Sequence, residues 1–388
     1  MKPETRAVHA GSEPQKHLGA VSPPIYQTVS FVASDTEELE AINSGQRKGF
    51  VYSRLRNPTV MAAEAKIAAL EEADSAVVFG SGMAAVDAAL SPLLGAGDRL
   101  VTLSDIYGGS YQLFHEVLPA RGIDVAWAAS SDPDAVERLM AGPCKVLFIE
   151  TPTNPLVRVV DIAAMADLAH RAGARLVVDS TLAGPLVQRP LALGADLVVH
   201  SASKYLNGHG DLIAGAVVGS RAMTRAVRAY RHTVGAILDP HAAWLLQRGL
   251  STYPLRMRQQ NDNGLYVAGF LARHSKVARV HYPGLGGHAQ HDLATRQMSG
   301  FGGLLSFEVT GGGAAARTVV DRCRLSAIGP SVGAIESLIS QPANTSHFSV
   351  PAEIRRQMGI SDNLVRLSVG IEAADDICAD LAQALEFA

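Results

Sequence analysis

The sequence predicts an α/β fold built on a mostly parallel sheet flanked by helices, and two observations carry this prediction. Six short segments rich in Val, Ile and Leu recur between residues 60 and 220, and most are near-continuous apolar runs. Such runs are typical of strands that are buried on both faces of a sheet. Helical stretches separate many of them, and this alternation predicts parallel strands joined by right-handed crossovers.

The expected elements begin with a helix over Val60–Glu71, an alanine-rich stretch that follows Pro58. Proline is favoured at the first position of a helix. The helices expected between the strands are Gly82–Leu94, Tyr107–Pro119 and Ile162–Ala172. The candidate strands are Ala76–Phe79, Arg99–Leu103, Lys145–Glu150, Arg175–Asp179, Asp196–His200 and Ala214–Val218.

Three regions are expected along the chain. Residues 1–60 are rich in Pro, Ser and Gly and predict an extended arm, which should pack on something because SPPIYQTVSFV contains aromatic and β-branched residues. Residues 61–250 form the main α/β domain. A long helical stretch over His241–Phe270 then leads into a smaller α+β domain at 251–388, where GFGGLLSFEV and LVRLSVGIE are expected to be strands and Ala373–Leu385 a final helix.

The composition argues against several classes of function. A formal net charge of −3 with scattered Lys and Arg gives no basic surface for nucleic acid. No apolar run approaches the roughly 18 residues that span a membrane, and the N-terminus lacks the apolar core of a secretory signal. The three cysteines (Cys144, Cys323, Cys378) have no paired spacing, and His288 and His291 have no third ligand. We therefore expect a cytoplasmic protein without a metal site or a disulfide framework.

The segment DLVVHSASKYLNGHGD, residues 196–211, places a lysine at the ligand edge of the predicted sheet. A buried strand ends at His200, and Ser201, Ser203 and Lys204 follow directly. Ligands bind at this end of the strands in a parallel sheet. A lysine there is easily desolvated and deprotonated, as a Schiff-base lysine must be, and the hydroxyls before it can hold a phosphate. A solvated loop lysine is the alternative for this segment alone.

Two further segments strengthen the case for a ligand site. Asp179 ends the buried strand before this one, and in FGSGMA a strand runs into Gly82 and Met83 at the start of a helix, where free N–H groups bind anions. A strand-end cap and a tight turn are the alternatives when each is taken alone. A lysine, a carboxylate and a phosphate cradle together indicate pyridoxal 5′-phosphate (PLP), whose pyridinium nitrogen needs a carboxylate partner to act as an electron sink.

These motifs and others resemble the Cys/Met-metabolism PLP enzymes of fold type I. That family includes cystathionine γ-synthase, cystathionine γ-lyase, cystathionine β-lyase, methionine γ-lyase and the homoserine sulfhydrylases, and the chain is most similar to the γ-synthases and γ-lyases. The resemblance spans nearly the whole chain. It is carried by YSRLRNPT, SGMAA, DIYGGS, ETPTNP, VVDST, HSASKYLNGHGD, YPGL, RQMSGFGGLLSFE, SVGAIESL and NLVRLSVGIE.

The resemblance implies a role for each residue that contacts the cofactor. Lys204 would bind PLP covalently and later shuttle protons, and Asp179 would pair with the pyridinium nitrogen. Tyr107 would stack on the ring and take part in proton transfer, and Asn154 would approach the ring hydroxyl. The residues expected to hold the phosphate are Gly82, Met83, Ser201 and Ser203.

The resemblance also implies a second subunit and a substrate anchor. Tyr52 and Arg54 would reach the phosphate of a neighbouring subunit, which accounts for the arm and implies a homotetramer made of two catalytic dimers. Arg366, with Ser331 nearby, would bind the α-carboxylate of a small amino-acid substrate, because a guanidinium fork suits a carboxylate. Glu336 would lie near the distal end of the substrate.

The chain departs from the family pattern at several positions. Ser180 stands where Asn is usual, Leu182 where Phe is frequent, and Gln341 where several members have His. Methionine γ-lyases carry a Cys at the position of Gly109, which counts against that activity. The β-lyases tend to have an aromatic residue at the position of Ile335, which counts against a β-lyase.

The reaction implied is γ-replacement on an O-activated homoserine by a thiol such as cysteine. γ-Elimination from cystathionine or a related sulfur amino acid is the alternative, and Ser180 and Gln341 leave room for a specialised pathway with another nucleophile. An aminotransferase would share the aspartate and lysine but would lack the residues of the arm and of the distal substrate end. A PLP-binding protein without turnover is disfavoured by Lys204, Tyr107 and Arg366.

Overall fold

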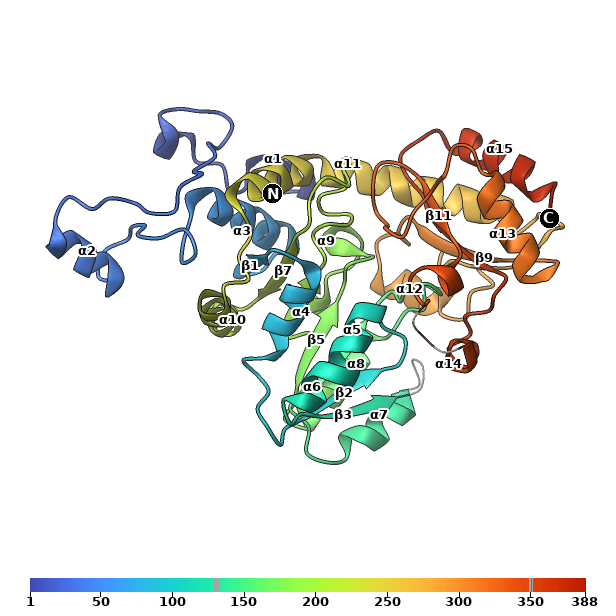
Figure 1. The fold of residues 1–388 in the computed structure, drawn as a ribbon, viewed down its shortest axis with the longest axis horizontal. Helices are drawn as coiled ribbons and strands as arrows, with labels where there is room; N and C mark the ends of the chain where they lie inside the picture. Colours follow the sequence, from blue (N-terminus) through green and yellow to red (C-terminus); the bar gives the residue numbers. More distant parts are fainter. Residues whose placement is uncertain (129–132, 349, 351) are drawn as a thin grey trace.

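The computed structural model describes residues 1–128, 133–348, 350 and 352–388. A seven-stranded sheet with helices on both faces occupies the middle of the molecule (Figure 1). β7 runs antiparallel to both of its neighbours, and the remaining pairs are parallel. In spatial order the strands are β1 (Ser75–Phe79), β7 (Gly215–Gly219), β6 (Leu197–His200), β5 (Arg175–Asp179), β4 (Val146–Glu150), β2 (Arg99–Leu103) and β3 (Asp124–Ala128).

This sheet confirms the predicted fold class and all six predicted strands. It adds β3, whose sequence DVAWA is partly exposed and has alanine and tryptophan where the other strands have runs of Val, Ile and Leu. Successive side chains point to opposite faces, as along β5, where Leu176 and Val178 pack in one core and Val177 in the other. Burial on both faces explains why these strands are almost entirely apolar.

Helices with clear start signals cover the two faces. α3 (Pro58–Glu71) starts at Asn57, whose side chain accepts hydrogen bonds from two backbone N–H groups, and α11 (Pro240–Leu271) starts at Asp239 in the same way. The residues over 108–120 form one helical run made of α5 (Gly108–Gln112), a π-turn (Leu113–Val117) and α6 (Leu118–Ala120). The remaining helices are α4 (Gly82–Leu90), α7 (Pro133–Met140), α8 (Ile162–Arg171), α9 (Gly184–Val187) and α10 (Arg221–Val234), with a 3-10 turn at Pro190–Leu193.

A second, five-stranded sheet lies at the C-terminal end of the molecule, and α11 runs from the first sheet to the second (Figure 1). One face of this sheet packs against α11, α13 (Gly312–Arg322) and α15 (Ala374–Leu385). α11 continues through residue 250, where the sequence predicts the boundary between the two domains. The position of this boundary stays a prediction. The strands, in spatial order, are β10 (Ala327–Ile328), β11 (Leu338–Ser340), β12 (Leu364–Ser368), β9 (Leu304–Val309) and β8 (Val277–His281), and the short helices are α12 (His291–Gln297), a 3-10 turn (Pro342–Asn344) and α14 (Ala352–Gln357).

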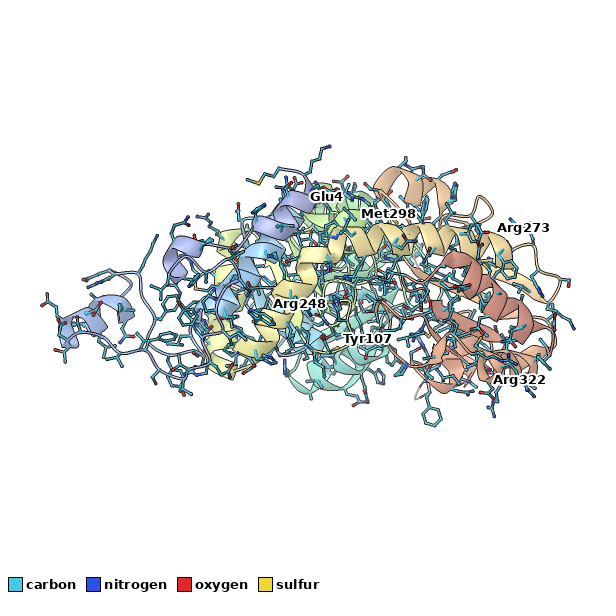
Figure 2. The ribbon with its side chains drawn as sticks, turned by 90° about the horizontal axis from the view of Figure 1, so that it is seen from above. Glu4, Tyr107, Arg248, Arg273, Met298 and Arg322 are labelled. Atoms are coloured by element: carbon cyan, nitrogen blue, oxygen red, sulfur yellow. The ribbon has the colours of Figure 1, made fainter. Side chains whose placement is uncertain are left out.

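The N-terminal region is less extended than expected at its start. α1 (Pro3–His9) packs on α3 and α11 and buries Ala7 completely. The chain then leaves the body through a 3-10 turn (Pro14–His17), and α2 (Thr36–Asn43) lies at the far end of the molecule in both views (Figures 1 and 2). Within the described residues, no helix combines the length and apolarity needed to cross a membrane.

Candidate active site

A cavity of about 410 Å³ lies where β4, β5 and β6 end, with β12 of the second sheet on its other side. Ligand-binding pockets are commonly of this size. Tyr107, one of its lining residues, lies near the middle of the long axis in Figure 2. The predicted site residues that line the cavity are Gly82, Met83, Tyr107, Asn154, Asp179, Ser201, Ser203, Lys204, Ser331 and Arg366.

Lys204 enters the cavity from the turn that follows β6. Its backbone N–H donates to Ser201 O at 3.1 Å, and its Nζ donates to Ser331 Oγ at 2.9 Å. Burial, and to a lesser degree the positive charge of Arg366, lowers the pKa of Lys204. The environment thus favours the neutral amine, which is the form that can attack an aldehyde.

Asp179 is the last residue of β5 and is held by Thr181. Its Oδ1 accepts hydrogen bonds from Thr181 N at 3.0 Å and Thr181 Oγ1 at 2.6 Å. Burial raises the pKa of Asp179, and the bonds from Thr181 and the nearby His200 oppose that rise. Within the described chain, Oδ2 forms no hydrogen bond, so a cationic N–H donor in the cavity would both satisfy it and keep the carboxyl group ionised.

The first turn of α4 and the turn after β6 meet at a set of free donors. Ser81 caps α4 by accepting from Ala84 N at 3.0 Å, and the N–H groups of Gly82 and Met83 have no acceptor within the helix. A Cβ at Gly82 would lie 2.9 Å from Ser201 Oγ, so only glycine allows this approach. The Ser201 hydroxyl makes no hydrogen bond to any described residue, and these donors therefore fit a phosphate.

Ser203 fits this cradle less well than predicted. Its hydroxyl donates to Ala214 O at 3.1 Å and accepts from Ala214 N at 2.9 Å. A hydroxyl has a single proton to donate, and here it is already used. Ser203 lines the cavity, but its role as a phosphate ligand stays a prediction that requires a change of partner.

Arg366 places a buried cation opposite Lys204. Its neighbours on β12, Val365 and Leu367, face the core of the second sheet, so Arg366 faces the cavity. The residue is 2% exposed, and its guanidinium donates to Asn154 Oδ1 at 3.2 Å and to Pro330 O at 2.7 Å. Burial lowers the pKa of Arg366 to about 10, which leaves it charged near neutral pH. No carboxylate of the described chain forms an ion pair with it, so the cavity fits an anionic ligand group.

The cavity also has polar residues that were not singled out from the sequence, and two of them hold predicted site residues. Thr181 holds Asp179 and also accepts a hydrogen bond from Ser201 N at 2.8 Å. Glu150 ends β4 and accepts hydrogen bonds from the backbone N–H groups of Tyr107 and Asn154. A signal was present for Glu150, because it begins the segment ETPTNP and ends a buried strand as Asp179 does.

Three predicted site residues lie away from the cavity. Tyr52 is in the projecting region and is 41% exposed, and Arg54 donates to the backbone carbonyl of His232 at the base of that region. Glu336 is exposed in the loop before β11. Their roles stay predictions.

The structure accounts for two departures from the family pattern. Ser180 is fully buried and accepts a hydrogen bond from Gln188 Nε2 at 3.3 Å. Gln341 donates to the carbonyls of Gly313 and Asp362 and so ties the loop after β11 to its neighbours. Neither residue lines the cavity, whereas a third departure, Leu182, does.

Comparison with known proteins agrees with the donor set of this cavity. The profile of the family described as Cys/Met metabolism PLP-dependent enzyme matches residues 4–386. The chain belongs to this family. L-methionine gamma-lyase of Pseudomonas putida is 43% identical over 98% of this chain and 96% of its own length, and cystathionine gamma-lyase of Bacillus subtilis is 41% identical over the whole of both. The structure of cystathionine gamma synthase from Xanthomonas oryzae pv. oryzae, in complex with aminoacrylate and cysteine, superposes with a TM-score of 0.95 at 37% identity and covers 100% of this chain and 98% of that one.

Membership of the Cys/Met-metabolism family establishes the cofactor and the broad activity. The protein is a PLP-dependent trans-sulfuration enzyme, either a synthase or a lyase. Relatives of both kinds share about the same fraction of residues with it, so identity alone does not distinguish the two activities.

Proposed function

We propose that the enzyme catalyses γ-replacement on an O-activated homoserine with a thiol such as cysteine. The convergence of Lys204, Asp179 and Arg366 on one cavity supports PLP-dependent chemistry on an α-amino acid, and a relative with γ-synthase activity supports replacement as its outcome. These residues supply an amine, a carboxylate whose Oδ2 has no hydrogen-bond partner among the described residues, and a buried guanidinium with which no described carboxylate forms an ion pair. An α-amino acid bound to PLP needs a partner for its α-carboxylate, a base at Cα, and an anion at the ring nitrogen.

Different residues of this chain would bind different parts of the cofactor. Gly82, Met83 and Ser201 would hold the phosphate, Asp179 the ring nitrogen, and Lys204 the aldehyde carbon. Bound in this way, PLP supplies the electron sink that stabilises negative charge on the substrate carbons. Tyr107 would cover one face of the ring, and Asn154 would approach the ring hydroxyl.

The same residues would then orient the substrate and move its protons. Arg366 would bind the α-carboxylate, and this fixes which substrate bond faces Lys204. Lys204, once its amine is free, would remove the Cα proton, and the burial that lowers its pKa favours the neutral amine, which is the form that acts as a base. Ser331 Oγ lies 2.9 Å from Nζ and is placed to steer the amine. A Cβ proton and the γ substituent, which leaves as a carboxylate such as succinate or acetate, would be lost next. The thiol sulfur would then add at Cγ, and protons would return to Cβ and Cα.

The arm belongs to the same proposal. Tyr52 and Arg54 would complete the phosphate site of a second copy, in a homotetramer built from two catalytic dimers. Exposed apolar side chains in this region, such as Val29 and Val32, support a partner surface.

Gly109 counts against methionine γ-lyase activity, because methionine γ-lyases carry a cysteine at this position. A Cβ there would lie 2.6 Å from Tyr107 Cε1, so this site leaves no room for that side chain without moving the tyrosine. The X. oryzae relative, a γ-synthase whose structure contains cysteine, supports γ-replacement by a thiol.

γ-Elimination from cystathionine is the second candidate. It is favoured by the B. subtilis γ-lyase, which aligns over the full length of both chains. The two reactions share every step up to departure of the γ substituent, so the same residues would serve either.

Product analysis separates the two candidates. The purified enzyme is incubated with O-succinyl- or O-acetylhomoserine plus cysteine, and in a second reaction with cystathionine alone. Formation of cystathionine in the first reaction supports γ-replacement. Absence of cystathionine there, together with 2-oxobutyrate in the second, would overturn it in favour of the lyase.

A further inference from the structure

Glu150 is a buried carboxylate of the cavity that none of the proposed steps uses. It is the last residue of β4, it is 4% exposed, and its Cα pairs in register with that of Asp179 on β5. Burial, and next the charge of Asp179, raises the pKa of Glu150 well above its usual value. A second carboxyl group beside Asp179 is therefore unfavourable unless its hydrogen bonds compensate.

Those hydrogen bonds connect two loops whose residues Tyr107 and Asn154 line the cavity. Glu150 Oε2 accepts from Tyr107 N at 2.6 Å, and Oε1 accepts from Asn154 N at 3.1 Å. Tyr107 directly precedes α5, and Asn154 lies in the loop after β4. The two oxygens of a single carboxyl group thus fix the backbone of both residues.

The connection continues into the second sheet. The side-chain Oδ1 of Asn154 accepts a hydrogen bond from Arg366 Nη1 at 3.2 Å. Hydrogen bonds therefore run from Tyr107 through Glu150 and Asn154 to Arg366. They join the proposed ring-covering residue to the proposed carboxylate anchor, which lies in a different sheet.

We propose that Glu150 is a positioning residue that fixes Tyr107 and Arg366 relative to one another through the backbone and side chain of Asn154. The position of the cofactor ring and the position of the substrate carboxylate would then be fixed relative to each other. Catalysis depends on such precise relative placement of the reacting groups. This inference rests on the proposed roles of Tyr107 and Arg366.

The test is Glu150→Gln, which keeps the size of the side chain but turns one acceptor oxygen into an N–H₂ group that faces a backbone N–H. Leaving one buried N–H without an acceptor should weaken PLP binding by about tenfold. The visible circular dichroism of the bound cofactor, per unit of absorbance, should also change, because it reports the asymmetric setting of the ring. With an amino-acid substrate, kcat should fall and KM should rise together.

The matched control is Asp380→Asn. Asp380 is a buried carboxylate in α15 that accepts hydrogen bonds from three backbone N–H groups (Arg324, Leu325 and Ser326) and does not line the cavity. The Asp380→Asn variant should have a lower unfolding temperature, and the circular dichroism of its bound cofactor should be the same as in the wild type.

Wild-type PLP affinity and circular dichroism in Glu150→Gln would overturn the proposal, as would an equal change in Asp380→Asn. Neither measurement needs a substrate. If the purified enzyme turned over none of the expected amino acids, the proposed reaction would fail and the positioning role would still be decided.

Discussion

Two regions of the molecule differ in how far they are packed within one chain. One is the edge of the seven-stranded sheet where β4, β5 and β6 end at the cavity, and the other is the projecting region after α1. At the edge, Asp179 and Arg366 are 8% and 2% exposed, and side chains of both sheets meet around one cavity. In the projecting region, Leu18 and Val32 are fully exposed, and the chain extends away from the body in both views (Figures 1 and 2). The edge is formed by packing within the chain, whereas the projecting region leaves apolar surface open.

This difference indicates which region of the chain needs a second subunit to pack against. An edge made of buried strand ends holds its polar groups without help, because the strands before them are packed on both faces. An exposed segment with several apolar side chains has no such support and would need another surface to pack on. We therefore expect changes at the edge to act within one chain and changes in the arm to act between chains.

The largest effect is expected at the centre of the edge. Lys204→Ala removes the only side chain of the proposed set that can bind PLP covalently, so turnover should be abolished. The purified wild-type protein should be yellow, with an absorption band at about 420 nm from a lysine–PLP imine, and the variant should lack that band. Spectra and product assays check this. Turnover by the variant would remove Lys204 from its role.

Mixing two defective chains tests the comparison itself, at a PLP concentration too low to load Arg54→Ala on its own. Arg54→Ala should weaken PLP binding by about tenfold through loss of a charge-assisted phosphate contact. If that contact crosses between subunits, co-expression with Lys204→Ala produces hybrids in which one cavity has both residues intact. Random pairing should then restore about a quarter of wild-type activity.

The control for this mixing experiment comes from the edge. Asp179→Ala and Lys204→Ala alter the same cavity of one chain, so their hybrids contain no intact cavity and should remain inactive. Recovery in this control, or no recovery with Arg54→Ala, would contradict the division between edge and arm.

The same division explains what the sequence predicts well and what it does not. Apolar runs that end in Asp179 and His200 place the aspartate and Lys204 at one edge, because strand ends of a parallel sheet meet there. The direction of β7 is not encoded in its apolar run, which reads the same in either orientation. The sequence shows that Glu150 ends a buried strand, but its role depends on N–H groups that folding brings to it from two separate loops.

A smaller effect is expected on the pH dependence of cofactor binding. The charge of Arg366 contributes to the lowered pKa of Lys204. Arg366→Leu removes that charge, so the pKa of Lys204 should rise and a higher pH should be needed to form the neutral amine. The rate at which the 420 nm band forms from apo-enzyme and PLP, measured against pH, should therefore have its midpoint at higher pH. Arg47→Leu, which changes an exposed arginine of the arm, should leave the midpoint in place.

The smallest effect is expected just behind the edge, at Ser180. Its hydroxyl accepts one hydrogen bond from Gln188, whose Nε2 also donates to Thr151 O at 3.1 Å. Ser180→Ala should therefore cost about 0.5–1.5 kcal/mol of unfolding free energy, measured by urea denaturation of the holoenzyme. Because Ser180 does not line the cavity, the ratio of cystathionine to 2-oxobutyrate should not change. A changed ratio would contradict this expectation. It would mean that Ser180, which follows Asp179 but does not line the cavity, influences which product forms.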